Sequence, residues 1–187
     1  MTDSNSDTAE QNTQLGFGGG CHWCTEAVFA SLSALQGVQQ GFICAAPPHE
    51  QYSEAVLVDF CEHDISIEIL IEIHLRTHAS FADHSMRNKY RSAIYVHDQS
   101  MEIRCKAALN ALQSQFKKPL VTQVLKITGF TLSAERYREY YASNPDKPFC
   151  TTYIEPKLEM LKREFRPYVN LQKVAAPPEN QTKNSDL

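Results

Sequence analysis

One stretch decides both the fold and the chemistry of this 187-residue chain: Phe17-Gly18-Gly19-Gly20-Cys21-His22-Trp23-Cys24-Thr25-Glu26. The three glycines let the backbone turn sharply and let another molecule approach closely. They place Cys21 where a helix is expected to begin, and there the unpaired backbone N–H groups and the helix dipole stabilise a thiolate. A lowered thiol pKa makes a cysteine a better nucleophile at neutral pH. We therefore interpret Cys21 as a nucleophile; the alternative is a buried structural cysteine.

Outward from this stretch, strand and helix patterns alternate along the chain. Gly37 is expected to end the first helix, and Ser66 and Ser133 are expected to cap later ones. The order predicts an α+β fold, a ferredoxin-like split β-α-β plait with additional C-terminal helices. We expect strands over residues 15–17, 38–45, 54–60, 90–96 and 120–130, and helices over 21–35, 67–77, 99–116, 134–143 and from Pro156 to near Phe165.

Composition predicts one domain with a polar tail at each end. The catalytic domain is expected over residues 14–171, with disordered tails over 1–13 and 172–187. The first residues contain no apolar stretch typical of a signal peptide, and no stretch is typical of a membrane span. The net charge is −4 and the basic residues are scattered, which argues against nucleic acid as a partner. We expect a cytoplasmic monomer that binds neither nucleic acid nor a membrane.

Cys24 completes a Cys-x-x-Cys spacing with Cys21, which is typical of thioredoxin-like redox pairs. The glycines before the motif and Thr25-Glu26 after it are not thioredoxin-like. Structural zinc needs four ligands, and a second closely spaced cysteine pair is absent from the sequence, so no metal is expected. The cytoplasm keeps thiols reduced, so the six cysteines are not interpreted as a disulfide framework.

Four ordered motifs resemble those of the A-type peptide methionine sulfoxide reductases. The glycine-rich stretch is similar to the family's Gly-Cys-Phe-Trp signature, which is followed by Gly or Cys and then by Glu. Together the motifs cover about residues 17–150, so the chain is identified as a member of this family. The other three motifs are Tyr52-Ser53-Glu54-Ala55-Val56, Tyr90-Arg91-Ser92-Ala93-Ile94-Tyr95, and Ala134-Glu135-Arg136-Tyr137 continuing to Asn144-Pro145 and Phe149-Cys150.

The resemblance implies a role for each matched residue. Cys21 corresponds to the catalytic cysteine, and Trp23 to the aromatic side chain that helps to hold the sulfoxide methyl group. Glu54 corresponds to the acid that protonates the sulfoxide oxygen, and Tyr90 to a tyrosine that hydrogen-bonds it. These roles are chemically consistent, because the oxygen leaves only when protonated and a carboxyl group with a raised pKa can supply that proton.

Two substitutions distinguish the substrate site from the family pattern. His22 stands where the family has Phe, so a polar ring replaces half of the apolar methyl-binding site. His22 is expected to support the Cys21 thiolate or to contact substrate; the alternative is an exposed helix histidine. Tyr52 precedes Glu54 by two positions and shares its strand face, so it is expected to replace an oxygen-binding tyrosine that the shortened preceding loop lacks.

The segment before Tyr90 is also shortened relative to the family. The family's pocket aspartate has no evident counterpart there. Asp83, His84 and Ser85 are the alternatives for its place, and none of the three is favoured.

The reaction that the resemblance implies begins with attack of the Cys21 thiolate on the sulfoxide sulfur while Glu54 protonates the oxygen. Methionine leaves, and Cys21 becomes a sulfenic acid. A second thiol then condenses with it to form a disulfide. Cys150 is the predicted partner, because it matches a family cysteine and follows Asn144-Pro145, and Cys24 is the alternative. Thioredoxin is expected to reduce the disulfide, with no bound cofactor.

The expected substrate is methionine S-sulfoxide in proteins, in peptides or as the free amino acid. Two other functions stay open. The first is a general thiol-disulfide oxidoreductase that uses Cys21 and Cys24. The second is a degenerate family member that binds oxidised methionine without turnover.

Overall fold

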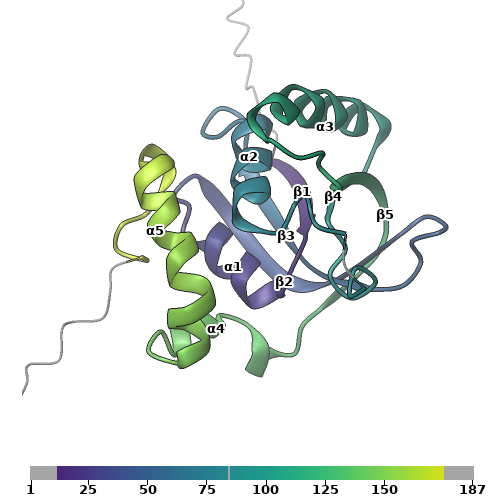
Figure 1. The fold of residues 1–187 in the computed structure, drawn as a ribbon. Coiled ribbons are helices and arrows are strands. Elements are labelled where there is room, and N and C mark those ends of the chain that lie inside the picture. The colour runs from purple at the N-terminus through teal and green to yellow at the C-terminus, as the bar shows by residue number, and fades with distance from the viewer. Residues whose placement is uncertain (1–11, 84, 175–187) are drawn as a thin grey trace, which may run out of the picture.

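The computed structural model describes residues 12–83 and 85–174 of the chain (Figure 1). The predicted disorder of residues 1–13 and 172–187 therefore falls mostly outside the described residues. Asn12 and Thr13 begin the first strand, which starts three positions earlier than expected. In chain order the elements are β1 (Asn12–Gly18), α1 (His22–Ala30), β2 (Leu35–Ala45), β3 (Ser53–Cys61), α2 (Ile67–Thr77), β4 (Ala93–Val96), α3 (Gln99–Leu112), β5 (Gln123–Leu132), α4 (Tyr140–Ser143) and α5 (Glu155–Glu164).

The five strands form one sheet that closes on itself in the order β1-β3-β2-β5-β4. All neighbours are antiparallel except β4 and β5, and β1 closes the barrel by pairing with β4. The mixed α and β content agrees with the predicted class. The closed sheet has a feature that the predicted plait did not include, because β5 pairs with both β2 and β4. The sequence predicted a strand near β5 but could not indicate its partners, which lie far away along the chain.

Capping residues explain the helices whose positions were predicted well. The Ser66 hydroxyl accepts a hydrogen bond from the Ile69 N–H, and α2 has the bounds that the sequence predicted. The Asp98 carboxylate accepts one from the Met101 N–H at 2.9 Å and starts α3. Pro156 lies in the first turn of α5, as predicted.

Two predicted helices were wrong in extent. The first ends at Ala30, and Gly37 lies inside β2 rather than ending a helix. The predicted helix over residues 134–143 is divided into a 3-10 turn at Glu135–Tyr137 and the single turn α4. Glu139 separates the two turns with a positive φ of 52°. Its N–H donates to the buried Glu26 carboxylate at 2.9 Å, a tertiary contact that local helix propensity does not reveal.

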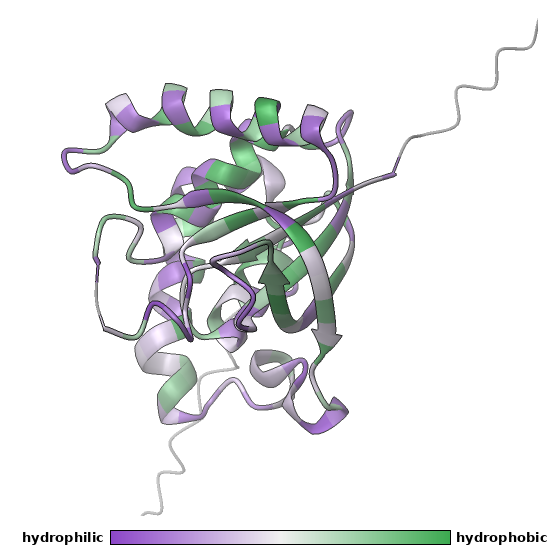
Figure 2. Cartoon of the chain, turned by 90° about the vertical axis from the view of Figure 1, so that its right-hand side faces the viewer, coloured by the Kyte–Doolittle hydropathy of each residue, from purple (hydrophilic) through white to green (hydrophobic). Residues whose placement is uncertain are grey.

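Two apolar clusters hold the fold together. The larger one lies between the outer face of the barrel and the helices, and it includes residues of α1, α2, α3 and α5. The smaller cluster contains alternate residues of the strands, Ile43, Ala45, Ala55, Leu57, Ala93 and Tyr95. Figure 2 shows hydrophobic residues along the strands, and hydrophobic and hydrophilic residues alternating along α3. Among residues 12–83 and 85–174, no helix is long and apolar enough to cross a membrane.

Register at one end of the barrel determines where the site forms. The last β1–β3 pair is Phe17 with Val56, so the end of β1 lies beside the start of β3. The glycine turn that follows β1 therefore lies next to Glu54, although the two are far apart in the sequence.

Candidate active site

Cys21 is the N-cap residue of α1, with the extended backbone angles φ −56° and ψ 127°. Its own carbonyl accepts the N–H groups of Cys24 and Thr25. Its pKa is lowered from the ordinary thiol value, first by a hydrogen bond from the Cys24 thiol and also by the Trp23 backbone N–H, while burial opposes the shift. These contacts favour the thiolate form of Cys21 over the ordinary thiol.

Buried histidines hold the glycine turn before Cys21 in place. His74 donates from Nε2 to the Gly18 carbonyl at 2.8 Å, and the His78 ring packs against Gly19 so closely that a Cβ at residue 19 would overlap it. Burial lowers the pKa of His78 to about 4, so this ring is neutral at pH 7. A hydrogen bond between His78 Nε2 and the Ser92 hydroxyl fixes the orientation of this ring. Glycine at residue 19 is therefore a packing requirement.

The Glu54 carboxyl group accepts a hydrogen bond from His22, the residue that follows Cys21. Its Oε2 accepts the His22 backbone N–H at 3.0 Å, and the Glu54 side chain is only 9% exposed. The His22 ring is buried as well, with Nε2 3.7 Å from Glu54 Oε2 and Nδ1 3.2 Å from the Gly41 carbonyl oxygen. The ring also packs edge-on against Phe42. His22 is therefore not an exposed helix histidine; it is a neighbour of the Glu54 carboxyl group.

Backbone contacts bring the segment around Tyr90 to Glu54. The Lys89 carbonyl accepts the Glu54 N–H at 3.0 Å and the Ser53 hydroxyl at 2.9 Å. The Arg91 N–H donates to the same hydroxyl at 2.8 Å. Tyr90 lies between these two anchored residues and is half-buried. The structure therefore brings Cys21, Glu54 and Tyr90 to one end of the barrel.

Trp23 lies in an aromatic cluster that the sequence did not predict. Its ring stacks on Tyr140, with centroids 4.1 Å apart and an interplanar angle of 6°, and it meets Phe149 edge-on at 5.6 Å. Within the described part of the chain, the buried Trp23 Nε1 has no hydrogen-bond partner. Tyr140 and Phe149 are thus site residues that sequence reasoning missed, although the aromatic-rich segment before Cys150 was a usable signal.

Tyr52 lies in the loop before β3 and is half exposed. A Cβ on Gly129 of β5 would lie 2.8 Å from the Tyr52 hydroxyl, so this ring reaches over β5. Of the three alternatives for the pocket aspartate, Asp83 and Ser85 are exposed, and His84 lies outside the described residues.

Three cysteines gather at the start of α1. The Cys24 thiol hydrogen-bonds to Cys21, and this bond together with burial raises the Cys24 pKa far above its ordinary value. Cys24 Sγ also lies 4.0 Å from the Tyr153 carbonyl oxygen, in the π turn Cys150–Ile154. Cys150 is fully buried, its thiol donates to the Asn144 carbonyl at 3.3 Å, and burial raises its pKa.

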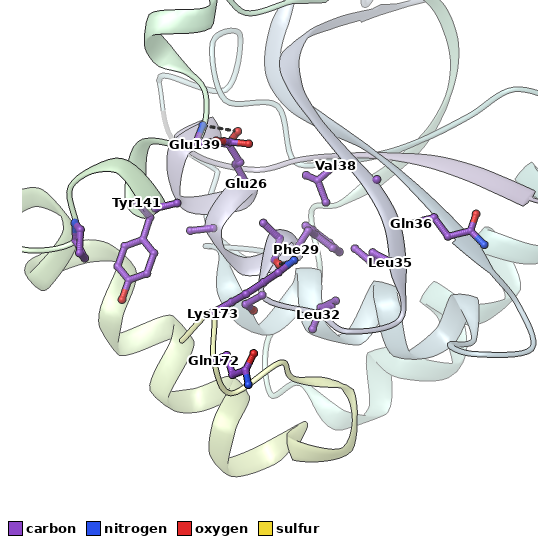
Figure 3. A pocket seen from close by; sticks show the side chains of 16 residues that line it. Glu26, Phe29, Leu32, Leu35, Gln36, Val38, Glu139, Tyr141, Gln172 and Lys173 are labelled. Carbon is purple, nitrogen blue, oxygen red and sulfur yellow. Dashed lines mark hydrogen bonds between the residues drawn. The ribbon is translucent and has the colours of Figure 1, made fainter. Parts of the chain in front are cut away.

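A separate cavity of about 550 Å³ lies between α1, the start of β2 and α4 (Figure 3). Glu26 lines it, and its carboxylate is held by the Gln40 amide at 2.7 Å and by the Glu139 N–H. None of the predicted site residues lines this cavity. In the described ranges, no group of three or more His, Cys, Asp or Glu side chains is arranged to hold a metal ion.

The chain is similar to known proteins over most of its length. The family model described as peptide methionine sulfoxide reductase matches residues 13–168. The peptide methionine sulfoxide reductase MsrA of Trichodesmium erythraeum is 29% identical over 164 residues, covering 79% of this chain and 93% of that protein. The enzyme of the same name from Deinococcus radiodurans is 29% identical over 181 residues, covering 84% of this chain and 88% of the relative.

Solved structures show the same fold. Reduced Mxr1 from Saccharomyces cerevisiae aligns with a TM-score of 0.66 at 18% identity, covering 78% of this chain and 92% of that one. Mxr1 in complex with Trx2 aligns with a TM-score of 0.56 at 15% identity, covering 73% and 91%. Because the family model spans most of the sequence, the chain belongs to the peptide methionine sulfoxide reductase family.

Proposed function

We propose that the protein reduces methionine S-sulfoxide, in peptides or as the free amino acid, to methionine. One observation carries this proposal: the Glu54 carboxyl group hydrogen-bonds to the backbone N–H of His22, directly after the Cys21 thiolate. The Glu54 carboxyl group therefore contacts the residue next to Cys21 and lies close enough for its charge to act on the Cys21 thiol. Sulfoxide reduction needs both a nucleophilic sulfur and a proton donor, because the sulfur is attacked while the oxygen is protonated.

The proposed reaction balances without a cofactor. The Cys21 thiolate attacks the sulfoxide sulfur and forms an S–S bond while Glu54 protonates the oxygen. The protonated oxygen then passes to the Cys21 sulfur as the substrate S–O bond and the S–S bond break. Methionine is released with its sulfur reduced, and Cys21 carries the oxygen as a sulfenic acid. Tyr90 holds the oxygen by its hydroxyl group, and Trp23 supplies the apolar surface for the methyl group. Tyr52 is a further substrate contact in this proposal.

We also propose how the whole chain is organised, where it acts and what reduces it. Residues 14–171 act as one catalytic unit and a monomer, in a cytoplasm that keeps thiols reduced. The first six elements follow the order of a split β-α-β plait, to which β5 adds the closing strand. Thioredoxin reduces the enzyme after each turnover, a step that the complex of Mxr1 with Trx2 supports.

Turnover of the two sulfoxide epimers tests the proposal. Peptides that contain S- or R-methionine sulfoxide are incubated with the protein and dithiothreitol, and methionine formation is measured. We expect turnover of the S epimer alone. If a folded protein reduces neither epimer but reduces insulin disulfides, the chain is a general thiol-disulfide oxidoreductase, the function that the adjacent Cys21 and Cys24 would favour.

The geometry favours Cys24 as the first thiol to react with the sulfenic acid. Cys21 is the N-cap residue rather than a helical one, so its sulfur can meet the side chain three positions later. Cys24 is the group that contributes most to lowering the Cys21 pKa, whereas Cys150 is fully buried and its thiol donates to the Asn144 carbonyl. We therefore place Cys24 first: it condenses with the Cys21 sulfenic acid, and water leaves. Cys150 then attacks the Cys24 sulfur, which frees Cys21 and leaves a Cys24–Cys150 disulfide.

A single turnover without reductant separates the two cysteines. Cys24→Ser should accumulate the Cys21 sulfenic acid, which dimedone traps, because the serine retains a hydrogen-bond donor but cannot form a disulfide. Cys150→Ser is the matched variant and should still form a Cys21–Cys24 disulfide, seen by mass mapping of peptides. Accumulation of sulfenic acid in Cys150→Ser, with a disulfide still formed in Cys24→Ser, would show that Cys150 reacts first.

A further inference from the structure

Lys89 lies beside the two groups that handle the sulfoxide oxygen, although no motif assigns it a role. Its Nζ is 3.4 Å from Glu54 Oε1, and it lies 4.9 Å from the centroid of the Tyr90 ring. The other Glu54 oxygen, Oε2, is already occupied by the His22 N–H. The ammonium group therefore faces the carboxyl oxygen that remains available for chemistry.

The backbone of Lys89 is held firmly, which makes this placement a property of the fold. Its carbonyl accepts hydrogen bonds from the Glu54 N–H and the Ser53 hydroxyl. Its own N–H donates to the Met86 carbonyl at 3.0 Å. With both backbone groups bonded, the side chain begins at a fixed point opposite Glu54.

The ion pair contributes little to the stability of the fold. The Lys89 side chain is 59% exposed, and exposed ion pairs of this kind contribute little to stability because water and salt screen them. Such a group is more valuable next to a bound sulfoxide, whose oxygen carries partial negative charge. A bound substrate also displaces water, and that strengthens a charged hydrogen bond to the oxygen.

We propose that the Lys89 ammonium group binds the sulfoxide oxygen together with Tyr90 while Glu54 protonates it. This inference rests on the proposed function and adds a group to its oxygen site. Lys89 thereby supplies a donor where the shortened loops lack the second tyrosine and the aspartate expected from the family pattern. Lys89 keeps its proton throughout; a hydrogen bond with Tyr90 and the charge of Glu54 both raise the Lys89 pKa.

The experiment compares Lys89→Met, Lys89→Arg and wild type by kcat/KM for a methionine S-sulfoxide peptide between pH 5 and pH 10. For Lys89→Met we expect a loss of about 10- to 100-fold, the range for one hydrogen bond to a charged group. Lys89→Arg keeps the cation and should remain within about threefold of wild type because it preserves this charge-assisted bond.

Two controls make the result specific. Lys106→Met removes a similarly exposed lysine paired with Glu102 on α3 and should leave kcat/KM unchanged. Alkylation of Cys21 by iodoacetamide should be alike in Lys89→Met and wild type, because Lys89 is not among the groups that shift the Cys21 pKa. An active wild type with an equally active Lys89→Met overturns the role of Lys89 alone, whereas an inactive wild type overturns the proposed function together with it.

Discussion

Replacing Cys21 with serine should lower kcat/KM for methionine S-sulfoxide by at least about 10⁴-fold, the scale seen when a nucleophile is removed. The structure lowers the pKa of the thiol through the Cys24 hydrogen bond and the Trp23 N–H, and neither contact can ionise a serine hydroxyl at neutral pH. Serine is also a favourable N-cap residue, so α1 should retain its start. Loss of turnover would therefore not reflect unfolding.

Steady-state kinetics with dithiothreitol and a thermal melt of both proteins measure this prediction. Cys44→Ser is the matched control, since Cys44 is a partly exposed cysteine on β2 whose sulfur contacts the Thr128 hydroxyl rather than the nucleophile. It should keep full activity. Appreciable turnover by Cys21→Ser at an unchanged melting temperature would assign the nucleophile to another thiol.

Glu54→Gln should reduce kcat/KM by about 10²–10⁴-fold, which is the usual contribution of a positioned proton donor. The amide oxygen can still accept the His22 N–H, so the local geometry is retained while the acidic proton is lost. The negative charge of Glu54 raises the Cys21 pKa. Its removal should therefore lower that pKa and speed alkylation of Cys21 near neutral pH, so turnover and thiol reactivity should change in opposite directions.

Stopped-flow alkylation and steady-state turnover on the same preparation give both readouts. Glu62→Gln, which disrupts an exposed ion pair with Arg104, serves as the control and should change neither one. If turnover and alkylation both stayed at the wild-type level, Glu54 would have no part in proton transfer.

Local signals in the sequence were enough to predict much of the fold. Ser66 followed by a periodic apolar run gave α2 its bounds, because both the cap and the buried face lie within a few residues. Closure of the barrel was not predictable in this way. It depends on β5 pairing with β2 and β4, and hydrophobic alternation in a strand does not identify its partners. The division of the helix near Glu139 has the same origin, a contact with the distant Glu26.

In the candidate site, too, residues in short local motifs were predicted, and residues that depend on distant contacts were not. Cys21, Glu54 and Tyr90 each lie in a short motif that could be recognised, and the structure brings them together. Lys89 and Tyr140 were missed because their significance comes from neighbours far along the chain, Glu54 for the first and Trp23 for the second. The burial of His22 was equally invisible, since it requires Phe42 of β2 to cover the ring.

The closed sheet has a consequence for how the protein meets other chains. In the described residues each of the five strands has a neighbour on both sides. Closure of a sheet leaves little free strand edge on which a misfolded strand could assemble. The barrel should therefore resist edge-to-edge aggregation.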